Sequence, residues 1–519
     1  MLAKKGFRLS AMAGTCSLRI LVQDDRLSFP FRTSHSIASE LYTPSPQAKL
    51  VKSFDEIPGN WKNRWLNLYH FWRRDGFHNI HNLMVENYQK YGPIYRENIG
   101  YYESINIIQP VDAAALFKVE GMFPERLLVQ PWLAYREYRK KKKGVLLKSG
   151  EDWRHDRLLL NREVLALSVM DRFLPFLNDV GEDFVKRIYS QIEKSGRGKW
   201  TADLSNDLFR FALESICNVL YGERLGLLQD NVDPEAQKFI DAVTTMFQST
   251  AIMMYISPWF LRMINAKVWR DHIESWDVIF TQADKCIQNI YRDLRLNRRA
   301  TTEYTGILSS LLLQTKLPLE DLKASVTELM AGGVDTTSIT LLWTMYELAR
   351  YPEVQNKLRA EIIASKEANQ GDLAKMLKSV PLVKAAVKES LRLHPVAVSI
   401  QRRTRQDTVI QNYFIPSGSL VQIGLYAMGR DPSIFAKPEK YNPERWLDKE
   451  NNHFKNLGFG FGPRQCLGRR IAEMEMQLFL IHILQHFKIE VSRLVDVKTT
   501  FDLILVPDRP INLTLRPLN

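Results

Sequence analysis

The 519-residue sequence contains no run of about 18 apolar residues, the length that an α-helix needs to cross the hydrocarbon core of a bilayer. We therefore expect any membrane attachment to be peripheral. Cysteine is scarce as well, and the four that occur are Cys16, Cys217, Cys286 and Cys466. Their number and unrelated spacings exclude a disulfide framework and fit a reducing compartment. The sequence also lacks internal repeats and nucleic-acid-binding motifs, so binding to nucleic acid is not expected.

The first 23 residues lack carboxylates and contain four basic side chains together with serine and threonine. This composition predicts an organellar transit peptide. A secretory signal is the alternative, because residues 9–18 carry no charge, but Arg19 argues against it. We expect the leader to cover about residues 1–39 and a single domain to cover residues 40–519. Residues 1–39 supply +4 of the formal net charge of +13, so the domain itself is basic and favours acidic partners or anionic membrane surfaces.

Apolar residues recur at intervals of three and four over much of the chain, which predicts a body of amphipathic helices. The clearest helical segments are residues 173–192, 203–220, 269–294, 319–350 and 470–486. Alternation typical of strands is confined to residues 94–97, 104–108, 409–415 and 420–425. The expected fold class is therefore mainly α with small β-sheets. Residues 140–143 are four consecutive lysines, and this charge block predicts a solvated loop.

Residues 459–468 read FGFGPRQCLG and lead directly into the helix predicted at 470–486. Glycines around a cysteine let the backbone approach a flat cofactor closely, while main-chain N–H groups can hydrogen-bond the sulfur. A position at a helix N-terminus also favours the thiolate, which donates electron density to haem iron and promotes O–O cleavage. The pattern predicts that Cys466 is an iron ligand. The alternative is a buried core cysteine, the interpretation that we prefer for Cys217 and Cys286.

Residues 331–337 read AGGVDTT in the middle of the long helix predicted at 319–350. Two glycines cost a helix roughly 1–2 kcal/mol, so a compensating reason is expected. We expect an interruption of the helix that opens a groove for dioxygen and frees backbone carbonyls for water. Asp335 and Thr336 would then be catalytic, relaying protons to dioxygen. The alternative is that the Thr336 hydroxyl bonds to the preceding turn of its own helix.

Other charged residues complete the pattern. Glu389 and Arg392 lie three apart on a predicted helix, and Arg445 offers a second guanidinium. We expect this trio to be structural, because a buried carboxylate needs charged partners. Haem carries two propionates, whose burial calls for cationic or N–H donors. The candidate donors are Trp153, Arg157, Arg402 and Arg464. For Arg157 the alternative is an exposed, solvated side chain.

The cysteine loop, the acid–threonine helix, the Glu-x-x-Arg helix and the Trp-x-x-x-Arg helix occur here in the order typical of the cytochrome P-450 superfamily. The sequence resembles that superfamily over about residues 50–519. The likeness is strongest to the mitochondrial branch, through WLNLYHFW at 65–72, KYGPIYRE at 90–97 and AGGVDTTS at 331–338. The resemblance implies a triangular helical body around a buried haem b, and the activity of a monooxygenase.

Within the mitochondrial branch, the resemblance implies that cholesterol is hydroxylated twice on its side chain and then cleaved to pregnenolone. It also implies that electrons pass from NADPH through a flavoprotein reductase to an acidic 2Fe–2S ferredoxin of the adrenodoxin type. The residues expected to bind the ferredoxin are Lys384, Lys388, Arg469 and Arg470. The two lysines lie four apart and so share one helical face, although an ordinary solvated surface is the alternative.

Two other functions stay open at this point. One is hydroxylation of the steroid ring system, as in the mitochondrial 11-beta-hydroxylases. The other is a non-catalytic haem-binding sensor, against which Asp335 and Thr336 argue, because a passive binder needs no proton relay.

By similarity, the sterol pocket is expected to be lined by Trp132, Leu146, Phe247, Thr336, Ala397, Ser399, Gln401 and Ile504. A sterol offers a large apolar body and one hydroxyl, so a mostly apolar cavity with one or two polar anchors is expected. Gln401 or Ser399 would orient the hydroxyl through water, while Leu146 and Phe247 fit a plain core equally well. The lysines at 140–143 replace the less charged, proline-containing turn usual in the family, close to the expected entry loop.

The apolar segment 251–264 is interrupted by Pro258 and is too short to span a bilayer. We expect it to dip into the membrane interface with Trp259 and Phe260 as anchors, and so to admit a membrane-dissolved sterol. A buried roof over the active site is the alternative. Together with the predicted leader, this segment predicts a peripheral protein on the matrix side of the mitochondrial inner membrane.

Overall fold

The structure is a computed structural model, and it describes residues 51–230, 233–296, 306–314, 317–448, 454–491 and 496–518. The leader expected over residues 1–39 lies outside the described residues, so its boundary with the domain stays a prediction. None of the helices within the described ranges is long and apolar enough to cross a membrane.

Helices make up most of the described chain, as the sequence periodicity predicted. In chain order they are α2 (Arg64–Arg73), α3 (Gly76–Tyr91), α4 (Pro110–Val119), α5 (Gln130–Arg139), α6 (Gly150–Val164), α7 (Leu167–Ser195), α8 (Ser205–Tyr221), α9 (Pro234–Met253), α10 (Pro258–Met263), α11 (Lys267–Arg295), α12 (Gly306–Gln314), α13 (Leu319–Arg350), α14 (Pro352–Ala368), α15 (Leu373–Lys378), α16 (Pro381–Leu393), α17 (Leu425–Arg430) and α18 (Arg469–His486). Short 3₁₀ helices lie at η1 (Phe54–Glu56), η2 (Pro443–Trp446) and η4 (Gly462–Arg464).

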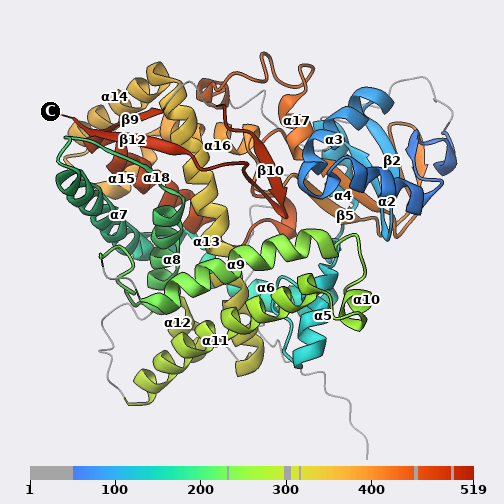
Figure 1. Cartoon of the computed structure of the whole chain (residues 1–519), viewed down its shortest axis with the longest axis horizontal. Helices are drawn as coiled ribbons and strands as arrows, with labels where there is room; N and C mark the ends of the chain where they lie inside the picture. The colour runs from blue at the N-terminus through green and yellow to red at the C-terminus, as the bar shows by residue number, and fades with distance from the viewer. Residues whose placement is uncertain are drawn as a thin grey trace, which may run out of the picture. The chain divides into compact units, whose positions relative to one another are not determined.

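The strands are short and form small sheets. They are β1 (Gly59–Asn60), β2 (Ile94–Ile99), β3 (Tyr102–Ile107), β4 (Trp200–Asp203), β5 (Ser399–Arg403), β6 (Thr408–Ile410), β7 (Tyr413–Ile415), β8 (Leu420–Gly424), β9 (Phe487–Val491), β10 (Thr499–Asp502), β11 (Ile504–Pro507) and β12 (Asn512–Pro517). The largest sheet has the order β1-β2-β3-β8-β5, and the others are β4-β12-β9, β10-β11 and β6-β7. In Figure 1 the largest sheet lies with α2, α3 and α4 to the right of the helical body.

Helix α13 runs through the helical body and is buried on almost all sides. Its 32 residues carry apolar or small side chains around nearly the whole circumference, a composition typical of a helix in the core of a large domain. It packs against α8, α11, α16 and α18, and Figure 1 shows it passing behind α9. The AGGVDTT segment therefore lies inside the protein.

The expectation of one strand over residues 409–415 was wrong. The segment is a hairpin of two short strands, β6 and β7, that pair across Gln411 and Asn412. Both turn residues have a positive φ, +50° and +67°, which is the backbone conformation of a tight hairpin turn. Apolar alternation continued through this turn in the sequence, so the period alone could not reveal the reversal.

The lysine block at 140–143 forms an exposed loop after α5, which confirms the expectation of a solvated segment. Lys140 ends the helix with a left-handed φ of +53°, and Lys141 lies 3.7 Å from Asp284. The residues that follow turn inward, because the Glu328 carboxylate of α13 accepts hydrogen bonds from the backbone N–H groups of Gly144 (3.0 Å) and Leu146 (2.8 Å). The charged loop is thus anchored at its inner end.

Candidate active site

The cysteine loop is closed by its own backbone. The N–H of Cys466 donates to the carbonyl of Phe459 at 2.8 Å, and Gly460 and Gly462 adopt φ values of +73° and +71°. Those left-handed conformations favour glycine. A Cβ on Gly462 would come within 2.3 Å of a carboxylate oxygen of Glu120. The glycines of the sequence motif are therefore required by the bend of the loop and by the side chain packed against it.

Cys466 is exposed, whereas Cys217 and Cys286 are buried. The alternative of a buried core cysteine is thus wrong for Cys466, and the core interpretation is confirmed for the other two. Surrounding protein atoms nevertheless desolvate the sulfur, and this raises the pKa of the Cys466 thiol. A hydrogen bond with the Gly468 backbone and the positive charge of Arg157 lower the pKa.

The Gly468 backbone at the start of α18 thus favours the thiolate, as expected, while desolvation opposes it. A coordinated metal ion deprotonates a thiol ligand outright. The exposed sulfur and its glycine-rich loop fit such a ligand.

Four guanidinium groups gather around this loop. Burial, together with repulsion from Arg126, Arg402 and Arg157, lowers the pKa of Arg464 to about 9. Among the residues that the structure describes, the anion in direct contact with the group is Glu120, whose carboxylate lies 2.6 Å from Nε of Arg402. This group of cations, three of them buried, favours a negatively charged ligand. The cluster fits the two propionates of a haem.

The hydrogen bonds that these arginines form within the protein do not occupy all of their N–H groups. Arg157 donates to the Gln465 carbonyl at 2.7 Å, and its buried Nε has no partner among the described residues. It is buried, so the alternative of a solvated Arg157 was wrong. Arg464 stacks on the ring of Trp153 at 3.8 Å. Arg402 donates to the Phe461 carbonyl at 3.0 Å, and so also fixes the cysteine loop.

Arg126 was missed by the sequence analysis. Its side chain donates to the Leu146 carbonyl, and burial lowers its pKa to about 10, while Cys466 and Glu328 raise it. The residue belongs to none of the motifs in the sequence, and only the fold brings it to the cysteine loop. We add it to the candidate propionate donors.

Helix α13 is unbroken at the AGGVDTT segment, so the expected interruption was wrong. The Thr336 hydroxyl donates to the Gly332 carbonyl at 2.8 Å, the local bond that was the alternative interpretation. The surroundings of the two glycines differ. A Cβ on Gly333 would lie 2.9 Å from Ile216 of α8, so this glycine permits close helix packing. A Cβ on Gly332 would meet open space, which leaves this face of the helix accessible.

Asp335 is buried beside Thr336, and burial raises the pKa of its carboxyl to about 7. The Thr244 hydroxyl of α9 donates to one carboxyl oxygen at 3.4 Å, and the other oxygen has no partner among the described residues. A carboxyl with this pKa exchanges its proton near neutral pH, as a proton relay requires.

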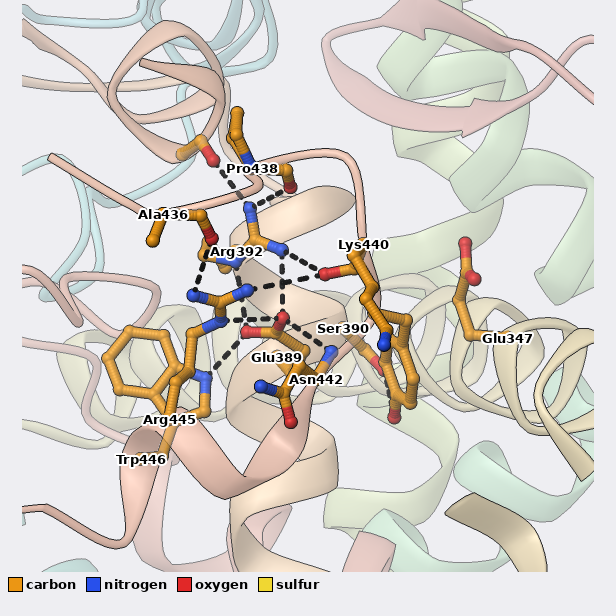
Figure 2. A network of polar contacts seen from close by, with 12 residues as sticks. Glu347, Glu389, Ser390, Arg392, Ala436, Pro438, Lys440, Asn442, Arg445 and Trp446 are labelled. Atoms are coloured by element: carbon orange, nitrogen blue, oxygen red, sulfur yellow. Dashed lines mark hydrogen bonds and ion pairs between the residues drawn. The ribbon is translucent and has the colours of Figure 1, made fainter. Parts of the chain in front are cut away.

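Glu389 of α16 is the centre of a buried polar network (Figure 2). Arg392 donates to both carboxylate oxygens at 2.9 and 2.8 Å, and Nε of Arg445 donates at 3.0 Å. The Trp446 indole and the Asn442 backbone N–H add donors at 2.8 and 2.9 Å. Figure 2 shows both guanidinium groups directed at the one carboxylate. The network ties α16 to residues 436–446, as a structural role requires.

The cysteine loop rests on the same helix. A Cβ on Gly458 would lie 3.2 Å from Leu391, the neighbour of Arg392 on α16. A distortion of α16 would therefore be transmitted through Gly458 to the loop that carries Cys466.

The predicted sterol-pocket residues fall into two groups. In the first, Trp132 of α5 donates from its indole to the Thr250 hydroxyl of α9 at 2.8 Å, and its ring lies 6.4 Å from that of Phe247. Leu146 lies on the turn held by Glu328, with its side chain half-buried. Trp132 and Phe247 are both buried in the main core. The structure thus brings Trp132 and Phe247 together between α5 and α9, and Leu146 packs against the same core.

The second group comes from the C-terminal half. Ser399 and Gln401 share one face of β5, and Ala397, just before that strand, is exposed. Ile504 of β11 is buried, and the next residue, Leu505, donates its backbone N–H to the Val396 carbonyl at 3.0 Å. The turn before β5 therefore lies beside β11, as a shared pocket wall requires.

The four residues expected to meet a ferredoxin lie on two helices in contact, α16 and α18. Lys384 is exposed, and Lys388 is half-buried. At the start of α18, Arg469 forms a 3.1 Å ion pair with Glu473, and Arg470 is half-buried. The structure places these cations near the segment that carries Cys466.

Comparison with known proteins defines the class. Residues 58–515 match the family model described as Cytochrome P450. The chain is 61% identical over 468 residues to the cholesterol side-chain cleavage enzyme, mitochondrial, of Oncorhynchus mykiss, covering 90% of this chain and 91% of the relative. It is 52% identical over 515 residues to the enzyme of the same name from Hypanus americanus, covering 99% and 100%. To the Homo sapiens enzyme it is 51% identical over 470 residues, covering 90% of each.

The chain therefore belongs to the cytochrome P450 family, which confirms the resemblance found in the sequence. Its cofactor is accordingly a haem iron, for which Cys466 and the surrounding guanidinium groups are suited.

Proposed function

We propose that this protein is a mitochondrial haem-thiolate monooxygenase that converts cholesterol to pregnenolone by two side-chain hydroxylations and cleavage of the bond between the hydroxylated carbons. The observation that carries the proposal is the likeness, over 90% or more of the chain, to relatives named for cholesterol side-chain cleavage. The cysteine loop with its surrounding arginines supports it, because such a site suits haem b. When bound, the haem iron activates dioxygen with electrons supplied from outside the protein.

The residues of the chain then have separate tasks. Cys466 supplies the sulfur ligand, and the propionates are held by Arg126, Arg157, Arg402 and Arg464 together with Trp153. Asp335 holds a proton on its carboxyl, and Thr336 passes it on from its hydroxyl. Electrons come from NADPH through a flavoprotein reductase and an adrenodoxin-type 2Fe–2S ferredoxin. This acidic protein docks on the basic residues of α16 and α18.

Reconstitution with the ferredoxin, its reductase, NADPH and cholesterol tests this function. Pregnenolone is the expected product. Formation of ring-hydroxylated steroids without pregnenolone would instead indicate a ring hydroxylase of the 11-beta type. Haem binding without any NADPH-dependent turnover would indicate a sensor.

The relay predicts that Thr336→Ala uncouples the reaction. Without the hydroxyl, protons arrive by less controlled routes, so the pregnenolone formed per NADPH consumed should fall by roughly tenfold. Thr340→Ala is the matched control, because Thr340 makes the same bond to its own helix, to the Thr336 carbonyl at 2.7 Å. Equal product and NADPH yields in Thr336→Ala and the wild type would contradict the relay.

We also propose that α10 attaches the protein to the matrix side of the mitochondrial inner membrane. Trp259, Phe260, Met263 and Ile264 are between 45% and 74% exposed, so the alternative of a buried roof does not apply to them. Helix α2 adds a second exposed aromatic face with Trp65, Tyr69 and Trp72. The two lie close together, because the ring of Phe71 in α2 is 5.0 Å from that of Tyr255, just before α10. Aromatic side chains gathered in this way favour a bilayer interface.

The double variant Trp259→Glu, Phe260→Glu should reduce binding to liposomes by at least about tenfold, because two large apolar side chains leave the interface. The measurement is co-sedimentation of the protein without its leader. Ile363→Glu combined with Leu447→Glu is the control, since both residues are 46% exposed but lie elsewhere, in α14 and directly after η2. Unchanged sedimentation of the first variant would contradict attachment through α10.

A further inference from the structure

A row of buried polar side chains crosses the largest sheet and ends at the predicted sterol anchor. Gln401 of β5 is paired in register with Gln422 of β8, and Gln422 with Asn106 of β3. On the neighbouring strand β2, Glu97 pairs with Ser104. Side chains in register on adjacent strands share a face and lie next to one another. The row therefore links Glu97, a buried acid to which the sequence analysis gave no role, to Gln401.

The hydrogen bonds along this row all run in one direction. Nδ2 of Asn106 donates to Glu97 at 3.2 Å, Nε2 of Gln422 donates to the Asn106 amide oxygen at 2.6 Å, and Nε2 of Gln401 donates to the Gln422 amide oxygen at 3.2 Å. An amide can present either end to a neighbour, but an ionised carboxylate can only accept. Glu97 thus decides which way each amide in the row points.

Other contacts of the row agree with this direction. Ser104 and Asn87 donate to the Glu97 carboxylate at 3.5 and 3.4 Å, and in the described part of the chain no cation pairs with it. The hydroxyls of Tyr102 and Ser399 donate to the Gln422 amide oxygen at 2.7 and 2.9 Å. Each of these groups thus donates either to Glu97 itself or to the Gln422 amide oxygen that Glu97 orients.

At the pocket end of the row, the donors of Ser399 and Gln401 are turned inward. Glu97, Asn106 and Gln422 are at most 7% exposed, whereas Ser399 and Gln401 are only half-buried. Nε2 of Gln401 also donates to the Ser399 hydroxyl at 3.2 Å, so within the described residues the acceptor of this pair that receives no hydrogen bond is the Gln401 amide oxygen. This end of the row is therefore a hydrogen-bond acceptor.

We infer that Glu97 is a positioning residue that makes the anchor accept a hydrogen bond directly from the ligand, and so selects sterols with a free hydroxyl over the corresponding ketone. The inference rests on the proposed function, since it requires that β5 lines the sterol pocket. A ketone oxygen only accepts, so it would face another acceptor and leave both groups unsatisfied. A hydroxyl donates and completes the row.

The test is optical titration of the wild-type holoenzyme at pH 8 with two saturated sterols, cholestan-3β-ol and cholestan-3-one, which differ only in the oxygen at one carbon. We expect the alcohol to bind about tenfold more tightly than the ketone, the cost of one unsatisfied polar group. Equal affinities overturn the inference, whatever any variant does. Failure of the wild type to form pregnenolone would instead overturn the proposed function, so the two failures are distinct.

Glu97→Gln keeps the shape of the side chain but can donate as well as accept. The preference for the alcohol should then shrink to less than about threefold, because the amides of the row can reverse. Glu103→Gln on the same hairpin is the control, since Glu103 is exposed and pairs with Arg96. Adding Asn106→Asp to Glu97→Gln moves the carboxylate one step along the row and should restore the preference. Equal weakening of both sterols in Glu97→Gln would show a merely structural role.

Acidification offers a second readout on the wild type. Burial raises the pKa of Glu97 to about 7, so its carboxylate is present at pH 8 and largely protonated at pH 6. The titratable groups that face it are Tyr88, Tyr95, Tyr102 and Tyr255, whose pKa values are raised by burial, so they stay neutral in this range. The preference for the alcohol should fall from pH 8 to pH 6 in the wild type but not in Glu97→Gln. A parallel fall in both would contradict the assignment to Glu97.

Discussion

Replacing Cys466 with serine is expected to lower pregnenolone formation by at least about a thousandfold, which corresponds to roughly 4 kcal/mol of activation free energy. A serine hydroxyl is a weaker electron donor than a thiolate, and electron donation by the sulfur promotes O–O cleavage. The loop itself should persist, because its closure depends on the backbone bond from residue 466 to the Phe459 carbonyl and on Gly460 and Gly462. The measurement is turnover per bound haem in the reconstituted system.

Cys217→Ala is the control for this experiment. Cys217 is fully buried in α8, and burial raises the pKa of its thiol well above the ordinary value, so it is an inert core side chain. Its replacement should leave turnover per haem within about twofold of the wild type. Comparable turnover in Cys466→Ser and Cys217→Ala would rule out Cys466 as the iron ligand.

Glu389→Gln should have the largest effect on stability, lowering the free energy of unfolding by about 3–5 kcal/mol. The variant leaves the guanidinium groups of Arg392 and Arg445 without their carboxylate, and Arg392 has a side chain only 2% exposed. A buried charge that loses its partner is strongly destabilising. Because the cysteine loop packs on α16, retention of haem should fall as well. Thermal unfolding and the ratio of haem to protein measure the two effects.

Glu444→Gln is a matched control from the same network region. Glu444 lies in η2 beside Arg445, but it is 51% exposed and its ion pair with Lys357 is at the surface. Such pairs contribute less than about 1 kcal/mol. If Glu389→Gln unfolded at the same temperature as Glu444→Gln, the buried network would not hold α16 in place.

Features with a local signature could be predicted from the sequence. The period of apolar residues placed the helices: α8, α11 and α13 were recovered within two residues of each end, whereas α7 begins six residues earlier than expected. The cysteine loop was predictable because its glycines, which the left-handed conformations at residues 460 and 462 require, are written in the sequence itself. Arg392 was found because it follows Glu389 by three residues on one helix, and Arg445 because it lies in the segment Pro443–Trp446.

Features that depend on residues distant in sequence could not be predicted. Glu120 pairs with Arg402 across almost 300 residues, and neither Arg126 nor Glu120 belongs to a motif. Gly333 is required because Ile216 of another helix, α8, packs against it. Since that contact cannot be read from the sequence, the two glycines suggested a break in α13, where the structure shows close packing. The row from Glu97 to Gln401 depends on strand register, which only the folded sheet reveals.

The most direct test of the account is the absorption spectrum of the reduced carbonyl complex of the folded wild-type protein. If the Cys466 sulfur binds the iron as a thiolate, this complex absorbs at the long wavelength that defines the family, and Cys466→His shifts the band to that of a histidine-ligated haem. A wild-type spectrum already of the histidine type, in protein that retains full haem content, would contradict the account.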